Sequence, residues 1–270
     1  MLQLYYSGAP NPAKVALFLE EAGMPYEAIP VDTRKGEQHS PEYLKINPNA
    51  KVPAIVDGDV VVFDSSAILL YLADKTGKFL PAKTDKARGE LLSWMFFVSS
   101  GVGPYAGQSV HFRVYAPEKI PYAIERYVKE TNRLYAVLNK RLSDREFIAG
   151  SYSIADMAAF PWVVPYERQG QKLTDFPHLK RWFEAIKARP AVARVYATLN
   201  PSHQKPMTDE EKRKAVARMG SEEERRARDY GEFMFDLVRM YEFDEGRHCV
   251  FDLSDEYQKR LCRDIDDKLN

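Results

Sequence analysis

The spacing of apolar residues changes once along the chain. Over residues 1–76, short apolar runs alternate with turn residues, and a helical apolar stripe lies between the first two runs. The predicted strands are Leu2–Tyr6, Tyr26–Val31, Ala54–Val56 and Val60–Phe63. A strand–helix–strand unit that leads into a hairpin and a further helix is the arrangement of the thioredoxin-like fold.

Cap residues predict where the two main helices of this part begin and end. Asn11 is the expected N-cap of the first helix, Pro12 fits its first position, and Gly23 ends it. Ser65 is the expected N-cap of the second helix, and Gly77 offers that helix a left-handed terminator.

From Lys83 to about Thr198 the apolar spacing is helical throughout. The predicted helices are Arg88–Val98, Pro121–Leu142, Ile154–Tyr166, Leu179–Ala188 and Val192–Leu199. The predicted fold is therefore an α/β thioredoxin-like domain over residues 1–80 and an all-α helical-bundle domain over residues 86–204. Residues 205–270 are first densely charged and then rich in aromatic and acidic residues. We expect them to form a helical C-terminal appendix that is too small to bury a core alone.

Glycine and aromatic residues interrupt the helical pattern over residues 101–112. Glycine permits close backbone approach, and aromatic rings with a polar group suit the wall of an apolar pocket. A plain interhelical loop is the alternative. The residues expected to line a pocket for a second substrate are Tyr105, His111, Phe112 and Tyr166.

Ser153 and Asp156 form a Ser-x-x-Asp capping box directly before an apolar run. We interpret the pair as structural, because it starts a helix whose next residues are core types.

Composition excludes several functional classes. The chain has 270 residues, with 39 Lys and Arg against 39 Asp and Glu, so bulk charge favours neither nucleic acid nor an anionic membrane. No apolar run approaches 18 residues and no basic leader opens the chain, which favours a cytoplasmic protein. Cys249 and Cys262 are the two cysteines, so a disulfide framework, a redox pair or a cysteine-bound metal in residues 1–248 is excluded.

Two features of residues 47–72 suggest ligand chemistry. Val52-Pro53 follows a polar loop and precedes a strand, and a cis bond there would turn the backbone of Val52 outward as an edge for an extended ligand. Asp64 and Ser65 precede a helix, where a carboxylate and free backbone N–H groups suit a zwitterionic ligand end. An ordinary trans proline and a simple cap are the structural alternatives.

These patterns together resemble the cytosolic glutathione transferases, most closely the bacterial Nu class, whose members include glutathione-dependent disulfide-bond reductases. The resemblance covers about residues 1–200. The matching segments are Ala9-Pro-Asn-Pro-Ala-Lys, Leu17-Phe-Leu-Glu-Glu-Ala-Gly, Val52-Pro-Ala-Ile, Asp64-Ser-Ser-Ala-Ile-Leu-Leu-Tyr-Leu, Ile120-Pro-Tyr-Ala-Ile-Glu-Arg-Tyr, Leu134–Leu142 and Tyr152-Ser-Ile-Ala-Asp.

The resemblance implies glutathione as co-substrate and assigns its contacts. Val52 and Pro53 would present backbone to the cysteinyl part. Asp64 and Ser65 would hold the γ-glutamyl end. The two residues expected near the glycyl side are Gln38 and Lys51.

The resemblance also implies that Asn11 stabilises the glutathione thiolate, together with the N-terminus of its helix. A thiol with an ordinary pKa near 8.5 ionises more readily beside such donors. The family usually has a threonine two residues before this Asn, whereas the chain has Ala9, which cannot donate. Ser7 and Tyr6 are the candidate substitutes.

The function expected is a dimeric enzyme in which glutathione thiolate reduces small disulfides. Conjugation of glutathione to electrophiles is an alternative within the same chemistry. A non-catalytic glutathione-binding or dimerisation module that serves residues 205–270 is the alternative from another class. A glutaredoxin-like mechanism is disfavoured, because no cysteine lies near Asn11.

Overall fold

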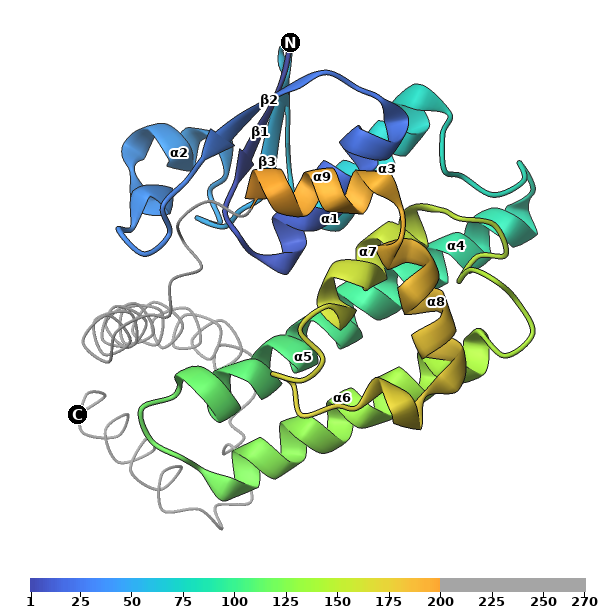
Figure 1. The fold of residues 1–270 in the computed structure, drawn as a ribbon. Helices are drawn as coiled ribbons and strands as arrows, with labels where there is room; N and C mark the ends of the chain where they lie inside the picture. The colour runs from blue at the N-terminus through green and yellow to red at the C-terminus, as the bar shows by residue number, and fades with distance from the viewer. Residues whose placement is uncertain (200–270) are drawn as a thin grey trace, which may run out of the picture. The chain divides into compact units, whose positions relative to one another are not determined.

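The structure is a computed structural model, and it describes residues 1–199. The predicted C-terminal appendix, together with residues 200–204, lies outside the described residues. A four-stranded sheet with the order β2-β1-β3-β4 forms the first part (Figure 1), which confirms the thioredoxin-like prediction. Its strands are β1 (Leu2–Tyr6), β2 (Tyr26–Pro30), β3 (Ala54–Asp57) and β4 (Val60–Phe63). β1 and β2 are parallel, and the other two pairings are antiparallel.

The helices of the first part lie on both faces of this sheet. They are α1 (Pro10–Ala22), α2 (Pro41–Ile46) and α3 (Ser65–Thr76), with a 3-10 turn, η1 (Glu37–His39), before α2. α1 and α3 cover one face of the sheet, and α2 lies on the other side (Figure 1).

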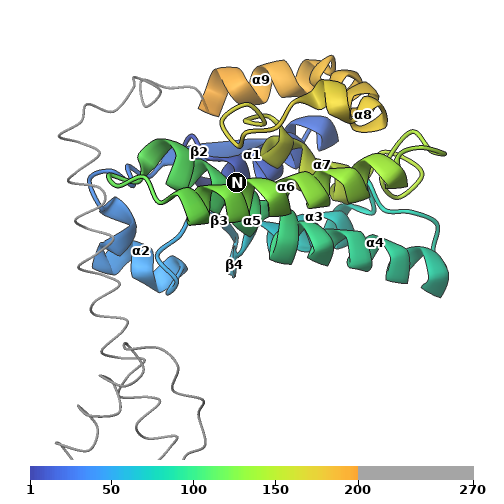
Figure 2. The same cartoon turned by 90° about the horizontal axis from the view of Figure 1, so that it is seen from below.

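All residues of α1 from Pro12 to Leu19 are buried, which is more than the predicted stripe. The reason is that α1 contacts α3 on one side and α7 (Ile154–Val163) and α9 (Pro190–Leu199) on others (Figure 2).

Both predicted N-caps were wrong by one or two residues. The first helix begins at Pro10 with Ala9 as N-cap, because the N–H of Ala13 donates to the carbonyl of Ala9 at 3.3 Å. Asn11 is therefore the second helical residue. The N-cap of α3 is Asp64, not Ser65, because the Asp64 side chain accepts the first free N–H groups of the helix. The glycine terminators are confirmed, since Gly23 and Gly77 both have a φ of 66°.

The described residues after position 84 are almost wholly helical, as predicted. Besides α7 and α9, the helices are α4 (Asp85–Phe97), η2 (Val98–Val102), α5 (Gly103–Val110), η3 (His111–Tyr115), α6 (Pro121–Arg141), η4 (Leu173–Asp175) and α8 (Pro177–Lys187). Among the described residues, no helix is both long enough and apolar enough to cross a membrane. The position of the domain boundary, residues 80–86, stays a prediction.

The predicted interruption at residues 101–112 is not a loop. The helical path from α4 through η3 is continuous, with two wide π turns at η2 and η3. The glycines serve packing: a Cβ at Gly103 would lie 3.0 Å from Trp162 Nε1, and one at Gly101 would lie 3.3 Å from a methyl of Leu134.

The capping box is confirmed, and its acid also accepts hydrogen bonds from residues outside the box. Asp156 accepts from the N–H and hydroxyl of Ser153, from the N–H of Ile148 at 2.9 Å and from Trp182 Nε1 at 2.8 Å. Its carboxylate is fully buried, and burial raises its pKa to about 6. The box therefore joins α7 to α8 and to the loop before it.

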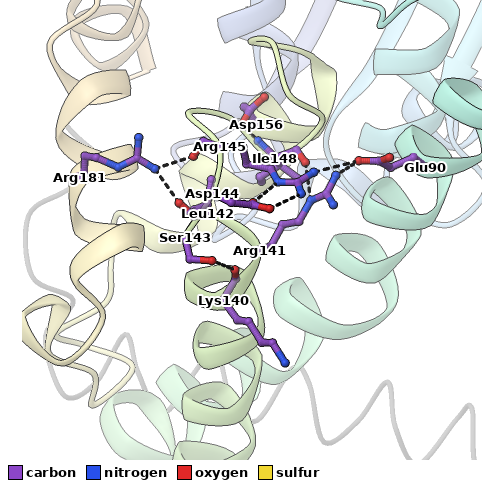
Figure 3. Close-up of polar contacts among 10 residues, drawn as sticks. All are labelled: Glu90, Lys140, Arg141, Leu142, Ser143, Asp144, Arg145, Ile148, Asp156 and Arg181. Atoms are coloured by element: carbon purple, nitrogen blue, oxygen red, sulfur yellow. Dashed lines mark hydrogen bonds and ion pairs between the residues drawn. The ribbon is translucent and has the colours of Figure 1, made fainter.

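An arginine cluster fastens the C-terminal end of α6 (Figure 3). Arg141 pairs with Glu90 of α4 and donates to the carbonyl of Ile148 at 2.8 Å. Arg181 of α8 donates to the carbonyls of Leu142 and Arg145 at 2.8 and 2.7 Å, so carbonyls that follow the helix end are satisfied by a side chain.

Candidate active site

Four chain segments leave the sheet at the same end. Tyr6 of β1 lies opposite Pro30 of β2, Tyr5 lies opposite Ala54 of β3, and Ala54 lies opposite Phe63 of β4. The segments that adjoin these strand ends are residues 7–11, 31–40, 51–53 and 64–66. They contain every residue that the sequence suggests for glutathione except Tyr6, which is the last residue of β1.

Asn11 supplies the free donors at the N-terminus of α1. Pro10 and Pro12 have no N–H, and the N–H of Ala9 donates to the carbonyl of Ser7 at 2.8 Å. The backbone N–H of Asn11 is therefore the one helix-start donor that remains among the described residues, and the side-chain amide of the same residue lies beside it. Asn11 is half-buried. This end of the helix offers a small, concentrated donor site.

The Asn11 amide is held by a residue from the other part of the chain. Trp162 Nε1 of α7 donates to Asn11 Oδ1 at 3.0 Å. No pattern in the sequence indicates this contact, because 151 positions separate the two residues.

The predicted substitutes for the missing threonine occupy different surroundings. Tyr6 is buried in the apolar core, and its hydroxyl makes no hydrogen bond within the described residues. Ser7 is half-buried at the strand end and precedes the turn into α1, so its hydroxyl lies in the segment that leads to Asn11. Geometry therefore favours Ser7 over Tyr6 as a second donor.

The Val52–Pro53 peptide bond is cis, as the sequence suggested. Neither backbone polar group of Val52 is hydrogen-bonded within the described residues. The carbonyl of Lys51, in contrast, accepts from Tyr43 Oη at 2.7 Å and from Asn47 Nδ2 at 2.6 Å, while its side chain is exposed. The loop is thus fixed at Lys51 and leaves the edge at Val52 open.

Asp64 uses one carboxylate oxygen to cap α3. Its Oδ1 accepts from the N–H groups of Ser66 and Ala67 at 2.9 and 3.1 Å, so two of the N–H groups expected to be free for a ligand carboxylate are occupied. The N–H of Ser65 remains. Asp64 also has a φ of 70°, an uncommon conformation for a residue with a side chain, and such strain gathers at ligand sites.

Lys14, which sequence reasoning missed, lies beneath this helix start. Its side chain is buried, and Nζ donates to Ser65 Oγ at 3.3 Å. Burial lowers the pKa of Lys14 to about 8, although the nearby Asp64 carboxylate opposes that change. A lone lysine in the apolar run of the first helix was the available signal.

Gln38 lies on η1, in the loop that follows β2. Its Nε2 donates to the carbonyl of Thr33 at 3.4 Å, and its Oε1 is buried without a partner within the described residues. The loop thus positions Gln38 at the sheet end, but gives it an incomplete set of hydrogen bonds.

Three of the four residues predicted to line a second-substrate pocket form one aromatic cluster. Phe112 stacks on Tyr127 of α6 at 5.3 Å between ring centroids, and Tyr105 lies 6.2 Å from the same ring. His111 packs against Phe112 at 5.0 Å. Tyr166 contacts Phe183 of α8 instead. The sequence missed Tyr127, which lies on the polar-looking helix that faces the cluster.

Two family models match the chain. Residues 2–74 match the model described as glutathione S-transferase, N-terminal domain, and residues 105–190 match glutathione S-transferase, C-terminal domain.

Similar proteins carry related names. Disulfide-bond oxidoreductase YfcG of Escherichia coli (strain K12) is 49% identical over 203 residues, which are 72% of this chain and 94% of the relative. A glutathione transferase structure from Burkholderia graminis holds two glutathione molecules per subunit; it is 40% identical, with a TM-score of 0.68 over 76% of this chain and 89% of that one. A Pseudomonas putida glutathione transferase structure holds one glutathione disulfide per subunit, at 37% identity and a TM-score of 0.68 over 72% and 90% of the chains.

Proposed function

The chain belongs to the glutathione S-transferase family, and from that premise we propose that it is an enzyme that reduces small disulfides with glutathione. The observation that carries the proposal is that the segments with Asn11, Val52 and the Asp64–Ser65 pair all adjoin one end of the sheet. An extended tripeptide with a charged end and a central thiol matches those three features in turn.

Each part of glutathione has a proposed contact. Val52 and Pro53 present the open backbone edge to the cysteinyl residue. Ser65 and the free oxygen of Asp64 take the γ-glutamyl end, and Lys14 adds a positive charge beneath it. Gln38 and the exposed Lys51 side chain take the glycyl carboxylate.

Asn11 is the proposed catalytic residue. Its backbone N–H and side-chain NH₂ donate to the glutathione sulfur, and the donated hydrogen bonds favour the thiolate. Ser7 is the second candidate donor. Tyr6, whose ring lies in the apolar core, is the weaker one.

The reaction needs two glutathione molecules and no protein thiol. The thiolate attacks one sulfur of the substrate disulfide, the S–S bond breaks, and the leaving thiolate takes a proton from water. A second glutathione thiolate attacks the mixed disulfide, which releases glutathione disulfide and the second substrate thiol. The two glutathiones are oxidised by two electrons in total, and the substrate disulfide is reduced by two. Two relatives' structures, one with two glutathiones and one with glutathione disulfide, support this stoichiometry.

The first test is reduction of hydroxyethyl disulfide by glutathione, with wild type and Asn11→Ala compared. One lost hydrogen bond to a charged group corresponds to roughly 1.5–3 kcal/mol, so kcat/KM should fall at least about tenfold. Asn132→Ala, an exposed amide on α6 whose Nδ2 donates to Gln171 Oε1, is the matched control and should keep full activity. Equal activity in wild type and Asn11→Ala would remove Asn11 from the site.

Conjugation is the second candidate, because the cluster of Tyr105, Phe112 and Tyr127 offers half-buried aromatic rings to an aromatic electrophile. Chlorodinitrobenzene tests it: the thiolate forms a carbon–sulfur bond and chloride leaves. Turnover of this compound without disulfide reduction would favour conjugation. Glutathione binding without either reaction would favour the non-catalytic module.

The proposal includes a homodimer and a cytoplasmic location. Reduced glutathione is abundant in the cytosol, where the reaction has its reductant. Exposed apolar residues of β4 and α4 support the dimer.

A further inference from the structure

The amide of Asn11 has two chemically different ends, and the reaction requires one particular end at the sulfur. An amide oxygen only accepts hydrogen bonds, whereas the NH₂ group donates two. A thiolate needs donors, so the oxygen facing it would repel it. Nothing in the backbone of α1 selects between the two orientations, which differ by a half-turn of the amide.

Trp162 makes this selection. The indole N–H is a donor and has no acceptor capacity. Its 3.0 Å contact with Asn11 is therefore satisfied by the amide oxygen alone, and the NH₂ group must point to the other side. Within the described residues that NH₂ group has no acceptor.

Contacts of both its ring and its backbone hold Trp162 in place. Gly103 and Gly107, one turn apart on α5, leave room for the ring to lie against the helix, since a Cβ there would stand 3.0 Å from Nε1 and 3.5 Å from Cη2 respectively. The carbonyl of Trp162 accepts from Gln169 Nε2 at 2.6 Å, and Gln169 is buried and accepts in turn from Tyr135 Oη at 2.7 Å. α7 also packs directly against α1 (Figure 1).

We propose that Trp162 is a positioning residue that orients the Asn11 amide so that its NH₂ group faces the glutathione sulfur. The inference rests on the proposed function, because it takes Asn11 as the group beside the thiolate. It adds that a residue of the helical part determines which end of an amide in the sheet-containing part faces the sulfur.

The test replaces Trp162 by Phe, which keeps an aromatic ring and removes the N–H. The pKa of the glutathione thiol in the complex is read from the ultraviolet absorbance of the thiolate during a pH titration. It should rise by about one pH unit, and kcat/KM for hydroxyethyl disulfide should fall about tenfold below that pKa and approach wild type above it. Trp94→Phe, a half-buried tryptophan of α4, should change neither quantity.

A double variant separates orientation from general damage. If Trp162 acts through the amide, Trp162→Phe should have no further effect on the thiol pKa in an Asn11→Ala background. Gly103→Ala supplies an independent perturbation, because its Cβ would displace the indole nitrogen. Its matched control is Gly89→Ala on α4, where a Cβ meets nothing within 4 Å. We expect Gly103→Ala to raise the thiol pKa and Gly89→Ala to leave it unchanged.

The outcomes distinguish this inference from the proposed function. An unchanged thiol pKa in Trp162→Phe, with a raised one in Asn11→Ala, would overturn the positioning role alone. So would a full additional effect of Trp162→Phe in the double variant. An unchanged thiol pKa in Asn11→Ala itself would overturn the assignment of Asn11.

Discussion

Lys14 is a buried ammonium that donates to a hydroxyl and makes no salt bridge within the described residues. Its side chain is 2% exposed, and Nζ donates to Ser65 Oγ. A charged lysine in such surroundings loses hydration, which is why its pKa falls from 10.5 to about 8 despite Asp64. The residue is therefore a sensitive reporter of the electrostatics at the proposed γ-glutamyl subsite.

This pKa predicts how stability changes with pH. The folded pKa lies below the unfolded one, so between about pH 8 and pH 10.5 the unfolded chain binds more protons and the free energy of unfolding rises with pH. Relative to Lys14→Met, wild type should gain about 2 kcal/mol from about pH 7.5 to about pH 10. Urea unfolding of both proteins at several pH values measures this difference, and other titrating groups cancel between them.

A constant difference between the two proteins across that range would show that Lys14 titrates near its ordinary pKa. A difference that moves in favour of the variant as pH rises would contradict the sign. Lys45→Met, an exposed lysine in the last turn of α2, serves as the control and should track wild type throughout.

At the scale of elements, α7 depends on one buried acid. Asp156 satisfies four donors that come from Ser153, Ile148 and Trp182. Three segments of the chain thus donate hydrogen bonds to one carboxylate, which joins the start of α7 to α8.

Asp156→Ala should lower the free energy of unfolding by about 3 kcal/mol or more, because it leaves several buried donors without acceptors. Asp144→Ala is the control. That acid is exposed and pairs with Arg145 at the surface, so its loss should leave the free energy of unfolding close to that of wild type. Urea unfolding followed by circular dichroism measures both variants. A loss below about 1 kcal/mol for Asp156→Ala would mean that water reaches the vacated site.

Elements are predicted well from sequence where the residues that specify them lie within one helical turn. Ser153 and Asp156 act within one turn, so their roles can be inferred from spacing. The start of α1 was misplaced because Ala9 has no side-chain acceptor, and the start of α3 because Asp64 and Ser65 are both favoured N-cap types. Glycine usually interrupts a helix, but the glycines of α5 pack against Trp162, a partner distant in sequence.

At the scale of the whole molecule, exposed apolar residues gather on β4 and α4, which lie along the same side of the described chain (Figure 2). Val61 and Phe63 of β4 are exposed, and Phe96 of α4 is 59% exposed. β4 is also an edge of the sheet, with unpaired backbone groups. We expect this side to be the contact surface of the proposed homodimer.

Phe96→Asp should weaken such a dimer at least about tenfold, because it places a charge in the apolar contact. Light scattering after size-exclusion chromatography over a range of concentrations measures the change. Tyr122→Asp alters an aromatic residue that is 76% exposed on α6 and should leave the molar mass unchanged. A monomeric wild type, or an equal effect of both substitutions, would contradict the assigned surface.

The overall architecture was predictable, because local patterns specify the strands and the family resemblance covers about residues 1–200, and the same resemblance supplied the proposed glutathione-binding segments. The contacts between the two parts were not predictable. Lys14 under Ser65, Tyr127 against Phe112 and Trp162 on Asn11 are long-range pairs, and single-sequence periodicity carries no information about them.

The two prolines that flank Asn11 have a consequence for what this helix end can recognise. Helix starts that receive phosphate do so with several consecutive N–H groups, which share the oxygens of one ligand. Pro10 and Pro12 remove two of those groups and leave a single backbone donor. We therefore expect the Pro-Asn-Pro segment to discriminate against nucleotides and other phosphate esters, and to favour an anion whose charge resides on one atom.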